Sequence, residues 1–239
     1  MFYFFDGTKN GFLTAMVAAF HDESAVLTSK KIQLTLGESS VFVPTDDKKA
    51  ARTEARLQEI DRHCLWELDT LLRCGEIDNE QTAFLYLRAV AKAGRAIRNK
   101  LALSEVFKAK EYIQKVSFEI HRLHGFIRFM QTESGALYAP FSPDNDVCDL
   151  LLPHFCARLP HYPFVLHDVK RKKAAVYDGV RRFVAPLHNA DVLLSEKETA
   201  IQSLFKEYYD SVNIPERARP KQMRAYMPKR YWKFLTEKQ

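Results

Sequence analysis

The chain has 239 residues, of which 46% are hydrophobic and 28% charged, so it is long enough to bury a sizeable core as an ordinary globular protein. Its 36 Lys and Arg exceed its 30 Asp and Glu, and the net charge of +6 favours a polyanionic partner. The sequence carries neither a signal peptide pattern nor an apolar run of membrane-spanning length. We therefore expect a cytoplasmic protein that does not contact a membrane.

The first 45 residues alternate short apolar runs with turn signals. The aromatic run Phe2–Phe5 followed by Asp6-Gly7 predicts a strand and a turn. Thr8 is expected to cap a helix whose apolar residues follow helical spacing. Alternation of apolar and polar residues over 32–36 predicts a second strand, and residues 41–43 predict a third.

The middle of the chain has the periodicity of helices. Apolar residues spaced by three or four predict one helix over 57–71, a second over 78–101 and a third beginning at Ser104. Gly94 lies on the apolar stripe of the second helix, where we expect it to permit close helix packing. The pattern gives these helices a structural role.

From Gly125 onward the period changes. Residues 126–130 and 136–139 predict two strands, a helix opens at 143, and residues 164–167 and 174–177 predict two more strands. This β-β-α-β-β unit is typical of an α+β fold. A helix over 196–209 and a basic segment complete the chain.

We therefore predict a single α+β domain in which a small antiparallel sheet packs against a helical layer. Its successive parts are strand-helix-strands (1–45), the helical layer (46–125), the β-β-α-β-β unit (126–190), and a helix with the basic C-terminal segment (191–239).

Basic residues gather in two clusters, one over 168–182 and one over Arg219–Lys233. The second holds six Lys or Arg, no Asp or Glu, and aromatic rings among the charges. Cations beside π-faces suit a nucleic acid backbone and its unstacked bases. Alternatively, or at the same time, the rings anchor the segment to the core while its cations stay solvated. The predicted nucleic-acid contacts are Lys170, Arg171, Lys172, Lys173, Arg181, Arg182, Arg224, Lys229, Arg230, Tyr231 and Trp232.

A second set of residues is a candidate for catalysis. His154 and Arg158 share one helix face, and His167-Asp168 ends a strand that should pack near that helix. Together an imidazole, a guanidinium and a carboxylate bind a phosphate or act as an acid–base site. The alternative is an Arg–Asp ion pair that fastens the helix to the sheet. Asp178 follows another strand, where an Asp-Gly pair indicates either a turn or a carboxylate that points into a cleft.

The sequence offers little for a cofactor. The four cysteines have no C-x-x-C and no zinc-ligand spacing, and His121 and His124 have no third ligand placed by the sequence. Walker A, G-x-G-x-x-G, H-E-x-x-H and G-x-S-x-G motifs are also absent. We therefore expect reduced thiols and no metal or other cofactor held by this chain.

Six short motifs occur in one order along the chain. They are Tyr3-Phe-Phe-Asp6-Gly7 with Gly11-Phe-Leu-Thr14, His124-Gly-Phe-Ile-Arg-Phe129, His154-Phe-x-x-Arg158, His167-Asp-x-x-Arg171, Tyr177-Asp-Gly179 and Met227-Pro-Lys-Arg-Tyr-Trp232. In this combination the chain resembles a bacterial family of unknown function described as putative DNA metabolism or repair proteins. One departure is Arg219, where the family pattern has Asn before Pro-Lys.

Members of that family are typically encoded beside a radical S-adenosylmethionine protein, and some are fused to a uracil-DNA glycosylase domain. The resemblance therefore implies a DNA-binding accessory, repair or modification factor that acts with a radical S-adenosylmethionine partner. Two alternatives stay open. The chain is itself a DNA-acting enzyme of glycosylase-like or nuclease-like activity, or it is a protein-binding scaffold that contacts no nucleic acid.

Overall fold

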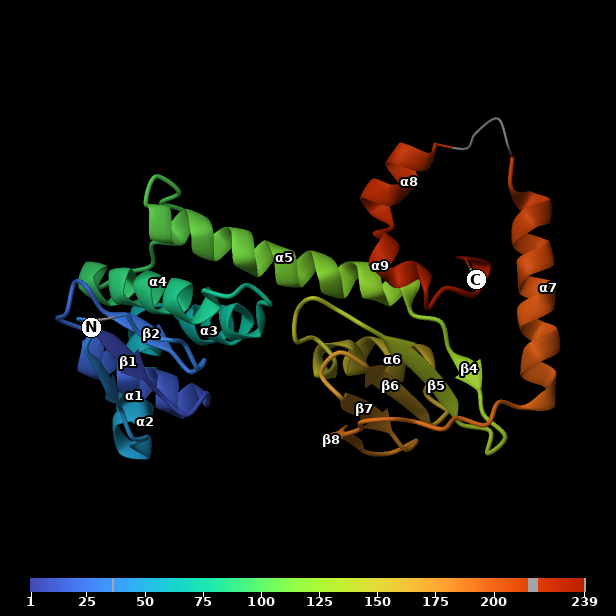
Figure 1. Cartoon of the computed structure of the whole chain (residues 1–239), viewed down its shortest axis with the longest axis horizontal. Coiled ribbons are helices and arrows are strands. Elements are labelled where there is room, and N and C mark those ends of the chain that lie inside the picture. Colours follow the sequence, from blue (N-terminus) through green and yellow to red (C-terminus); the bar gives the residue numbers. More distant parts are fainter. Residues whose placement is uncertain (36, 215–218, 239) are drawn as a thin grey trace. The chain divides into compact units, whose positions relative to one another are not determined.

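The computed structural model describes residues 1–35, 37–214 and 219–238, and it divides into two compact units, 1–116 and 117–239 (Figure 1). The long helix α5 (Ser104–Phe126) contributes its first half to one unit and its second half to the other. A boundary inside a continuous helix has no loop, glycine or proline to mark it, so the sequence carries no sign of this division. No helix in the described part of the chain is long and apolar enough to cross a bilayer.

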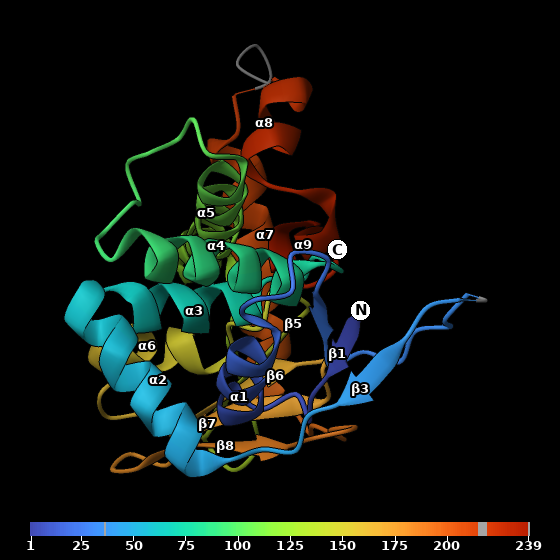
Figure 2. The ribbon, with the colours of Figure 1, turned by 90° about the vertical axis from the view of Figure 1, so that its left-hand side faces the viewer.

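Unit 1 contains a three-stranded sheet in the order β2-β1-β3, and both pairings are parallel. Strand β1 is followed by α1, which returns the chain to the same end of the sheet and so makes β2 parallel to β1. Helix α1 packs against α2, and α3 packs against α4 (Figure 2). Besides α5, the elements of unit 1 are β1 (Phe2–Phe4), α1 (Lys9–Ala19), β2 (Val26–Thr28), β3 (Ser40–Phe42), α2 (Asp47–Ile60), α3 (Cys64–Arg73) and α4 (Asn79–Ala93).

The predicted strands at residues 2–5 and 41–43 correspond to β1 and β3, but the strand predicted over 32–36 is wrong. Residues 32–35 form no strand, and Leu36 lies outside the described residues. Besides β3, the strand that pairs with β1 is β2, whose Leu27 is buried, whereas Ile32 is exposed. Alternation indicates a strand only where a core covers its apolar face, and at 32–35 no such burial occurs.

Two helical predictions need correction. The helix predicted over 57–71 is two helices, because Asp61 adopts an extended conformation and its carboxylate accepts the His63 N–H at 3.0 Å. Gly94 does not mediate helix packing, since a Cβ placed there would meet no atom within 4 Å. It has φ +60 and its N–H donates to Val90 O, so it ends α4 as a left-handed cap.

The first turn of α4 organises its neighbours through side-chain amides. Asn79 Nδ2 donates to the carbonyls of Leu71 and Leu72 at 3.2 and 2.9 Å, which satisfies the C-terminal end of α3. Gln81 accepts from Leu27 N at 2.8 Å and donates to Ala25 O at 2.9 Å. Its amide therefore pairs with the outer edge of β2 as the backbone of a further strand would.

Unit 2 contains a five-stranded sheet in the order β4-β5-β6-β7-β8. Besides the second half of α5, its elements are β4 (Met130–Gln131), β5 (Leu137–Phe141), the 3-10 turn η1 (Asp149–Leu151), α6 (Leu152–Arg158), β6 (Phe164–Asp168), β7 (Lys173–Tyr177), β8 (Arg182–Pro186), α7 (Glu196–Val212), α8 (Pro220–Tyr226), α9 (Lys229–Trp232) and the 3-10 turn η3 (Thr236–Lys238).

This sheet is mixed, which corrects the predicted antiparallel arrangement. Strands β5 and β6 pair in parallel, and the other three pairings are antiparallel. The connection from β5 to β6 contains α6, and such a helical crossover brings the chain back to the end from which it started. Strand β8 was not predicted, because its first residue, Arg182, belongs to a run dominated by charge and turn signals.

The core of unit 2 lies between α6 and one face of the sheet (Figure 1). Phe155 of α6 meets Phe164 of β6 with ring centroids 6.5 Å apart, and Phe129 contacts both rings edge-on at 5.2 and 5.6 Å. Edge-to-face aromatic pairs stabilise beyond their buried area. These three rings therefore fasten the helix to the sheet.

The packing of the Asp6 carboxylate against Gly11 generates a stability prediction. The Asp6 carboxylate accepts from Thr8 N, Thr8 Oγ1 and Thr45 Oγ1 at 2.9, 2.7 and 2.7 Å. A Cβ on Gly11 would lie 2.0 Å from Asp6 Oδ1. Gly11→Ala should therefore lower the free energy of unfolding by about 1–3 kcal/mol in chemical denaturation.

Gly125→Ala is the matched control, because Gly125 is also helical and a Cβ there would meet nothing within 4 Å. It should be neutral or stabilise by up to about 1 kcal/mol, as expected from helix propensity. Equal effects of the two substitutions would refute the close-approach explanation.

Candidate nucleic-acid interface

The central feature of unit 2 is a buried carboxylate on α5. Glu119 is 1% exposed, and its oxygens accept from the backbone N–H groups of Asp144 and Asn145 at 3.0 and 2.7 Å and from Asn145 Nδ2 at 2.7 Å. They also accept from Tyr231 OH at 2.7 Å and Arg230 Nη2 at 3.2 Å. Burial acts to raise the pKa of Glu119, but these donors outweigh it and hold the pKa below its usual value.

The loop 143–146 connects Glu119 to the first basic cluster. Arg171 donates through its guanidinium to the carbonyls of Pro143, at 3.1 Å, and Asp144. Lys173 forms an ion pair with Asp146. These two cations therefore hold the loop in addition to the Glu119 carboxylate.

The same loop contacts the second basic cluster. Arg230 of α9 lies 3.0 Å from Asp144 Oδ2, while Arg171 contacts the carbonyl of the same residue. Two basic clusters about 60 positions apart in the sequence thus meet at Asp144. This is the arrangement that would place both along one surface, as a nucleic-acid interface requires.

Other cations of these clusters remain on the surface. Lys170, Lys172 and Lys229 are exposed, and for none of them does the described structure contain an ion pair. Lys172 has φ +52, so it occupies the left-handed position of the turn between β6 and β7. Lys229 Nζ lies 6.0 Å from the Trp232 ring centroid. We call Lys170, Lys172 and Lys229 the basic surface.

The C-terminal segment folds back onto unit 2, as its aromatic content predicted. Tyr231 is 2% exposed and its ring lies 5.8 Å from that of Phe126, while Leu235 is fully buried. Trp232 is half-buried and its Nε1 donates to Met227 O at 3.0 Å. Tyr231 and Trp232 are therefore anchors of the segment, and Arg230 lies over the Tyr231 ring at 4.6 Å.

The remaining predicted contacts lie elsewhere on the unit. Arg181 pairs with Asp178 at 3.3 Å in the turn between β7 and β8, which is the opposite end of β7 from Lys172. Arg182 is exposed at the start of β8. Arg224 donates to Pro220 O of its own helix at 3.2 Å. These cations are outside the set that meets at Asp144.

The catalytic candidates occupy structural positions. Asp168 is 0% exposed and pairs with Arg171 at 3.1 Å rather than with Arg158, which is exposed. His167 lies between Tyr138 OH, 2.6 Å from Nδ1, and Leu187 O, 3.1 Å from Nε2. Because a carbonyl only accepts, Nε2 donates to Leu187 O. Both ring nitrogens of His167 therefore have a hydrogen-bond partner inside the unit.

His154 stacks on His124 with ring centroids 4.0 Å apart and planes at 13°. The Nε2 atoms of both rings are buried without a hydrogen-bond partner. Burial, followed by the His154 ring, lowers the pKa of His124. Asp178 accepts from Val180 N and Arg181 N, so its carboxylate closes a turn. Among the described residues, no hydrogen bond or ion pair joins His154, Asp168 and Asp178 to one another.

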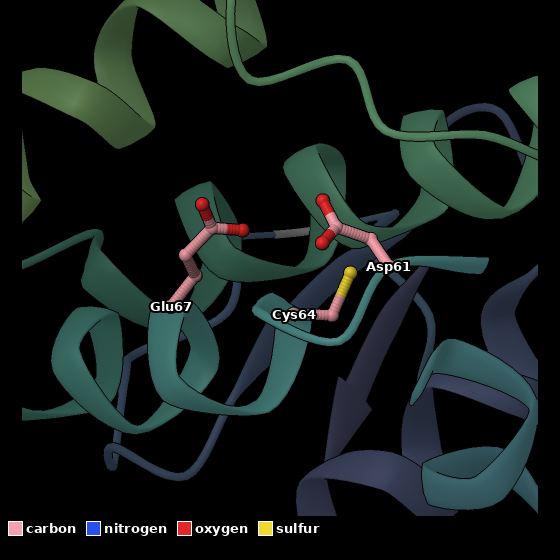
Figure 3. A group of neighbouring side chains, drawn as sticks. All are labelled: Asp61, Cys64 and Glu67. Atoms are coloured by element: carbon pink, nitrogen blue, oxygen red, sulfur yellow. The ribbon is translucent and has the colours of Figure 1, made fainter. Parts of the chain in front are cut away.

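Unit 1 contains a cluster that the sequence analysis missed. One ligand-type atom each of Asp61, Cys64 and Glu67 lies within 4.8 Å of the other two, and Figure 3 shows the three side chains pointing toward one another. The cluster contains a single cysteine, so it has no C-x-x-C pattern. The signal was the D-x-x-C-x-x-E spacing, which places Cys64 and Glu67 one turn apart on one helix face.

A family model for a domain of unknown function (DUF4130) matches residues 77–237, and the chain belongs to that family. The match spans α4, α5 and almost all of unit 2, including Glu119, loop 143–146 and both basic clusters. No curated protein and no solved structure is significantly similar to the chain. The family description assigns no activity, so a function for this chain has to be inferred from its geometry and chemistry.

The Glu119 contacts predict a specific pH dependence of stability. Because folding lowers the pKa of Glu119, its stabilisation is present above the unfolded value of about 4.3 and is lost as the pH falls through the folded pKa. Glu119→Gln should lower the free energy of unfolding at pH 7 by about 1.5–3 kcal/mol, since hydrogen bonds to a charged group are lost. The wild type and the variant should converge as the pH falls below 4.

Melting temperatures measured from pH 7 to pH 3 provide the check. Glu133→Gln is the matched control, because Glu133 is an exposed carboxylate of the same unit and its removal should leave the wild-type profile unchanged. A Glu119→Gln profile parallel to that of the wild type at every pH would contradict the assignment.

Proposed function

We propose that residues 117–239 bind DNA through the basic surface, and that the protein is a DNA-binding accessory factor in DNA repair or modification. The observation that carries the proposal is the meeting of two basic clusters at Asp144. Lys170 and Lys172 flank Arg171, and Lys229 precedes Arg230, so the side chains of the basic surface extend from residues fixed at one loop.

The distribution of charge along the chain also favours DNA binding by residues 117–239. Residues 117–239 contain 19 Lys and Arg against 14 Asp and Glu, so +5 of the net charge of +6 resides there. Phosphate contacts supply most of the affinity of sequence-independent DNA binding. An excess of cations on one unit is therefore what a backbone-binding surface requires.

The cations divide into two groups with different roles. Arg171, Lys173 and Arg230 are paired with Asp168, Asp146, Glu119 or Asp144 and hold the surface in shape. The lysines of the basic surface keep their full charge for a ligand. A surface whose backbone is already ordered loses less conformational entropy on binding, which favours affinity.

The accessory role is favoured over an enzymatic one by the environments of the catalytic candidates. Asp168 and His167 have their polar atoms satisfied inside the unit, and Asp178 closes a turn. The radical S-adenosylmethionine partner implied by the family resemblance would then carry out the reaction while this chain holds the DNA. Co-purification of the two proteins, with and without DNA, tests this part of the proposal.

The DNA-binding proposal predicts a strong salt dependence. Affinity should fall by about 10- to 1,000-fold between 50 and 200 mM salt if several cations contact phosphates. The double variant Lys170→Glu/Lys172→Glu should bind more weakly, and the slope of log affinity against log salt should decrease by about 2, since each phosphate contact contributes about 0.9. Fluorescence anisotropy with a labelled duplex measures both quantities.

The matched control is Lys197→Glu/Lys206→Glu, which reverses two exposed lysines of α7 in the same unit and should leave the slope almost unchanged. Salt-independent DNA binding by the wild type, or an equal loss of DNA affinity in both double variants, would contradict the proposal. Absence of DNA binding together with retained partner binding would support a scaffold role instead.

Lys229 and Arg230 are neighbours with different expected phenotypes. Lys229→Glu should weaken DNA binding without lowering the melting temperature, because Lys229 is exposed. Arg230→Glu should weaken binding and also destabilise the unit, because it places a carboxylate beside Glu119 and Asp144. Thermal unfolding and anisotropy on both variants separate the two roles, and identical melting temperatures would contradict the division of the cations.

A further inference from the structure

The cluster of Asp61, Cys64 and Glu67 in unit 1 lies at the start of α3. Asp61 precedes the helix, Cys64 is its first residue and Glu67 follows one turn later. Asp61 and Glu67 are buried and Cys64 is 0% exposed. Two carboxylates so close together inside a protein require positive charge beside them.

Arg98 supplies part of that charge. Its guanidinium forms an ion pair with Asp61 and lies 3.8 Å from Glu67 Oε1. Tyr86 OH donates to Glu67 Oε2 at 2.7 Å, and the Asp61 carboxylate accepts the His63 N–H. With both carboxylates ionised, one arginine leaves the cluster with one uncompensated negative charge.

The Cys64 thiol is the least explained member of the cluster. Figure 3 shows its sulfur next to the Asp61 carboxylate, and no hydrogen bond to the sulfur occurs in the described structure. One sulfur and two carboxylate oxygens within 4.8 Å of one another are donor atoms that zinc accepts.

We propose that Asp61, Cys64 and Glu67 bind a zinc ion. Zinc accepts thiolate and carboxylate ligands together, and a thiolate selects zinc over magnesium and calcium. A dication and a thiolate add one net positive charge, which offsets the one negative charge that Arg98 leaves uncompensated. Thus Arg98 is retained beside the carboxylates as an outer partner rather than displaced.

The geometry is close to what zinc requires. The three ligand atoms lie within 4.8 Å of one another, whereas zinc–ligand bonds of about 2.0–2.3 Å place tetrahedral ligands about 3.5 Å apart. A contraction of roughly 1 Å, by rotation of the Asp61 and Glu67 side chains, would close the site. Three protein ligands leave a fourth position for water, as in zinc sites that remain open.

A small cavity borders the cluster at Glu67. Its volume is about 140 Å³, and its lining includes Glu67, Tyr86 and Arg98 together with Trp66 and Val106. An entry path of this kind is a requirement for a metal site that fills after folding. Tyr86 and Arg98 border both the cavity and the carboxylates, so they orient the ligands from outside the metal's coordination sphere.

The test uses the full-length protein treated with a chelator and then titrated with Co²⁺ or Zn²⁺ alone. Cobalt should give a thiolate-to-metal charge-transfer band in the near ultraviolet that zinc suppresses stoichiometrically. Cys64→Ser should abolish the band. Cys74→Ser, which alters another buried thiol of unit 1 outside the cluster, should retain it.

Tyr86→Phe should keep the band but weaken zinc binding by about 10- to 100-fold, the usual effect of removing an outer partner of a ligand. Circular dichroism of each variant shows whether it is folded. A folded wild type that gives no cobalt band, or a band that persists in Cys64→Ser, would overturn the proposal and leave the cluster as an arginine–carboxylate network. Because the readout is independent of DNA, its result does not depend on the proposed function.

Discussion

Unit 2 depends on the burial of one negative charge. A carboxylate removed from water is stable only if hydrogen-bond donors surround it. The donors to Glu119 come from loop 143–146 and from α9. The positions of the chain's basic segments follow from that requirement. Arg230 is held by Glu119, Asp144 is held by both Arg230 and Arg171, and the exposed lysines take their places from these residues. An acidic residue in the interior thus organises the basic exterior.

Features with local causes were predictable from the sequence. Thr8 caps α1 by accepting the Gly11 N–H, α5 begins at Ser104, and the aromatic C-terminal segment folds back as expected. Features that depend on residues distant in the sequence were not predictable in this way. The direction of β5 relative to β6 depends on a crossover, and β8 depends on its pairing with β7. No local pattern encodes either, because propensity and periodicity describe a segment and not its neighbour in space.

The candidate site shows the same limit at the level of single residues. The sequence correctly indicated that Asp168 would pair with an arginine, but the helix-face argument selected Arg158, whereas the turn after β6 brings Arg171 back to it. The sequence indicated two basic clusters, but the loop that joins them carries acidic residues, so it gave no sign that the clusters meet. The Asp61 cluster was overlooked because its members differ in kind. A single cysteine between two carboxylates fits no familiar ligand pattern until burial shows that they face one another.

The amide of Gln81 has a consequence for the behaviour of the chain in a crowded cell. An outer strand with free N–H and C=O groups is a template on which another chain can add a strand, and this is a common route to aggregation. At the edge of β2, the Leu27 N–H and the carbonyl of Ala25, which precedes the strand, are already hydrogen-bonded to Gln81. The protection lasts only while the first turn of α4 is in place, so transient opening of that turn would expose the edge. The solubility of the protein is thereby linked to the local stability of one helical turn, and not only to that of the whole fold.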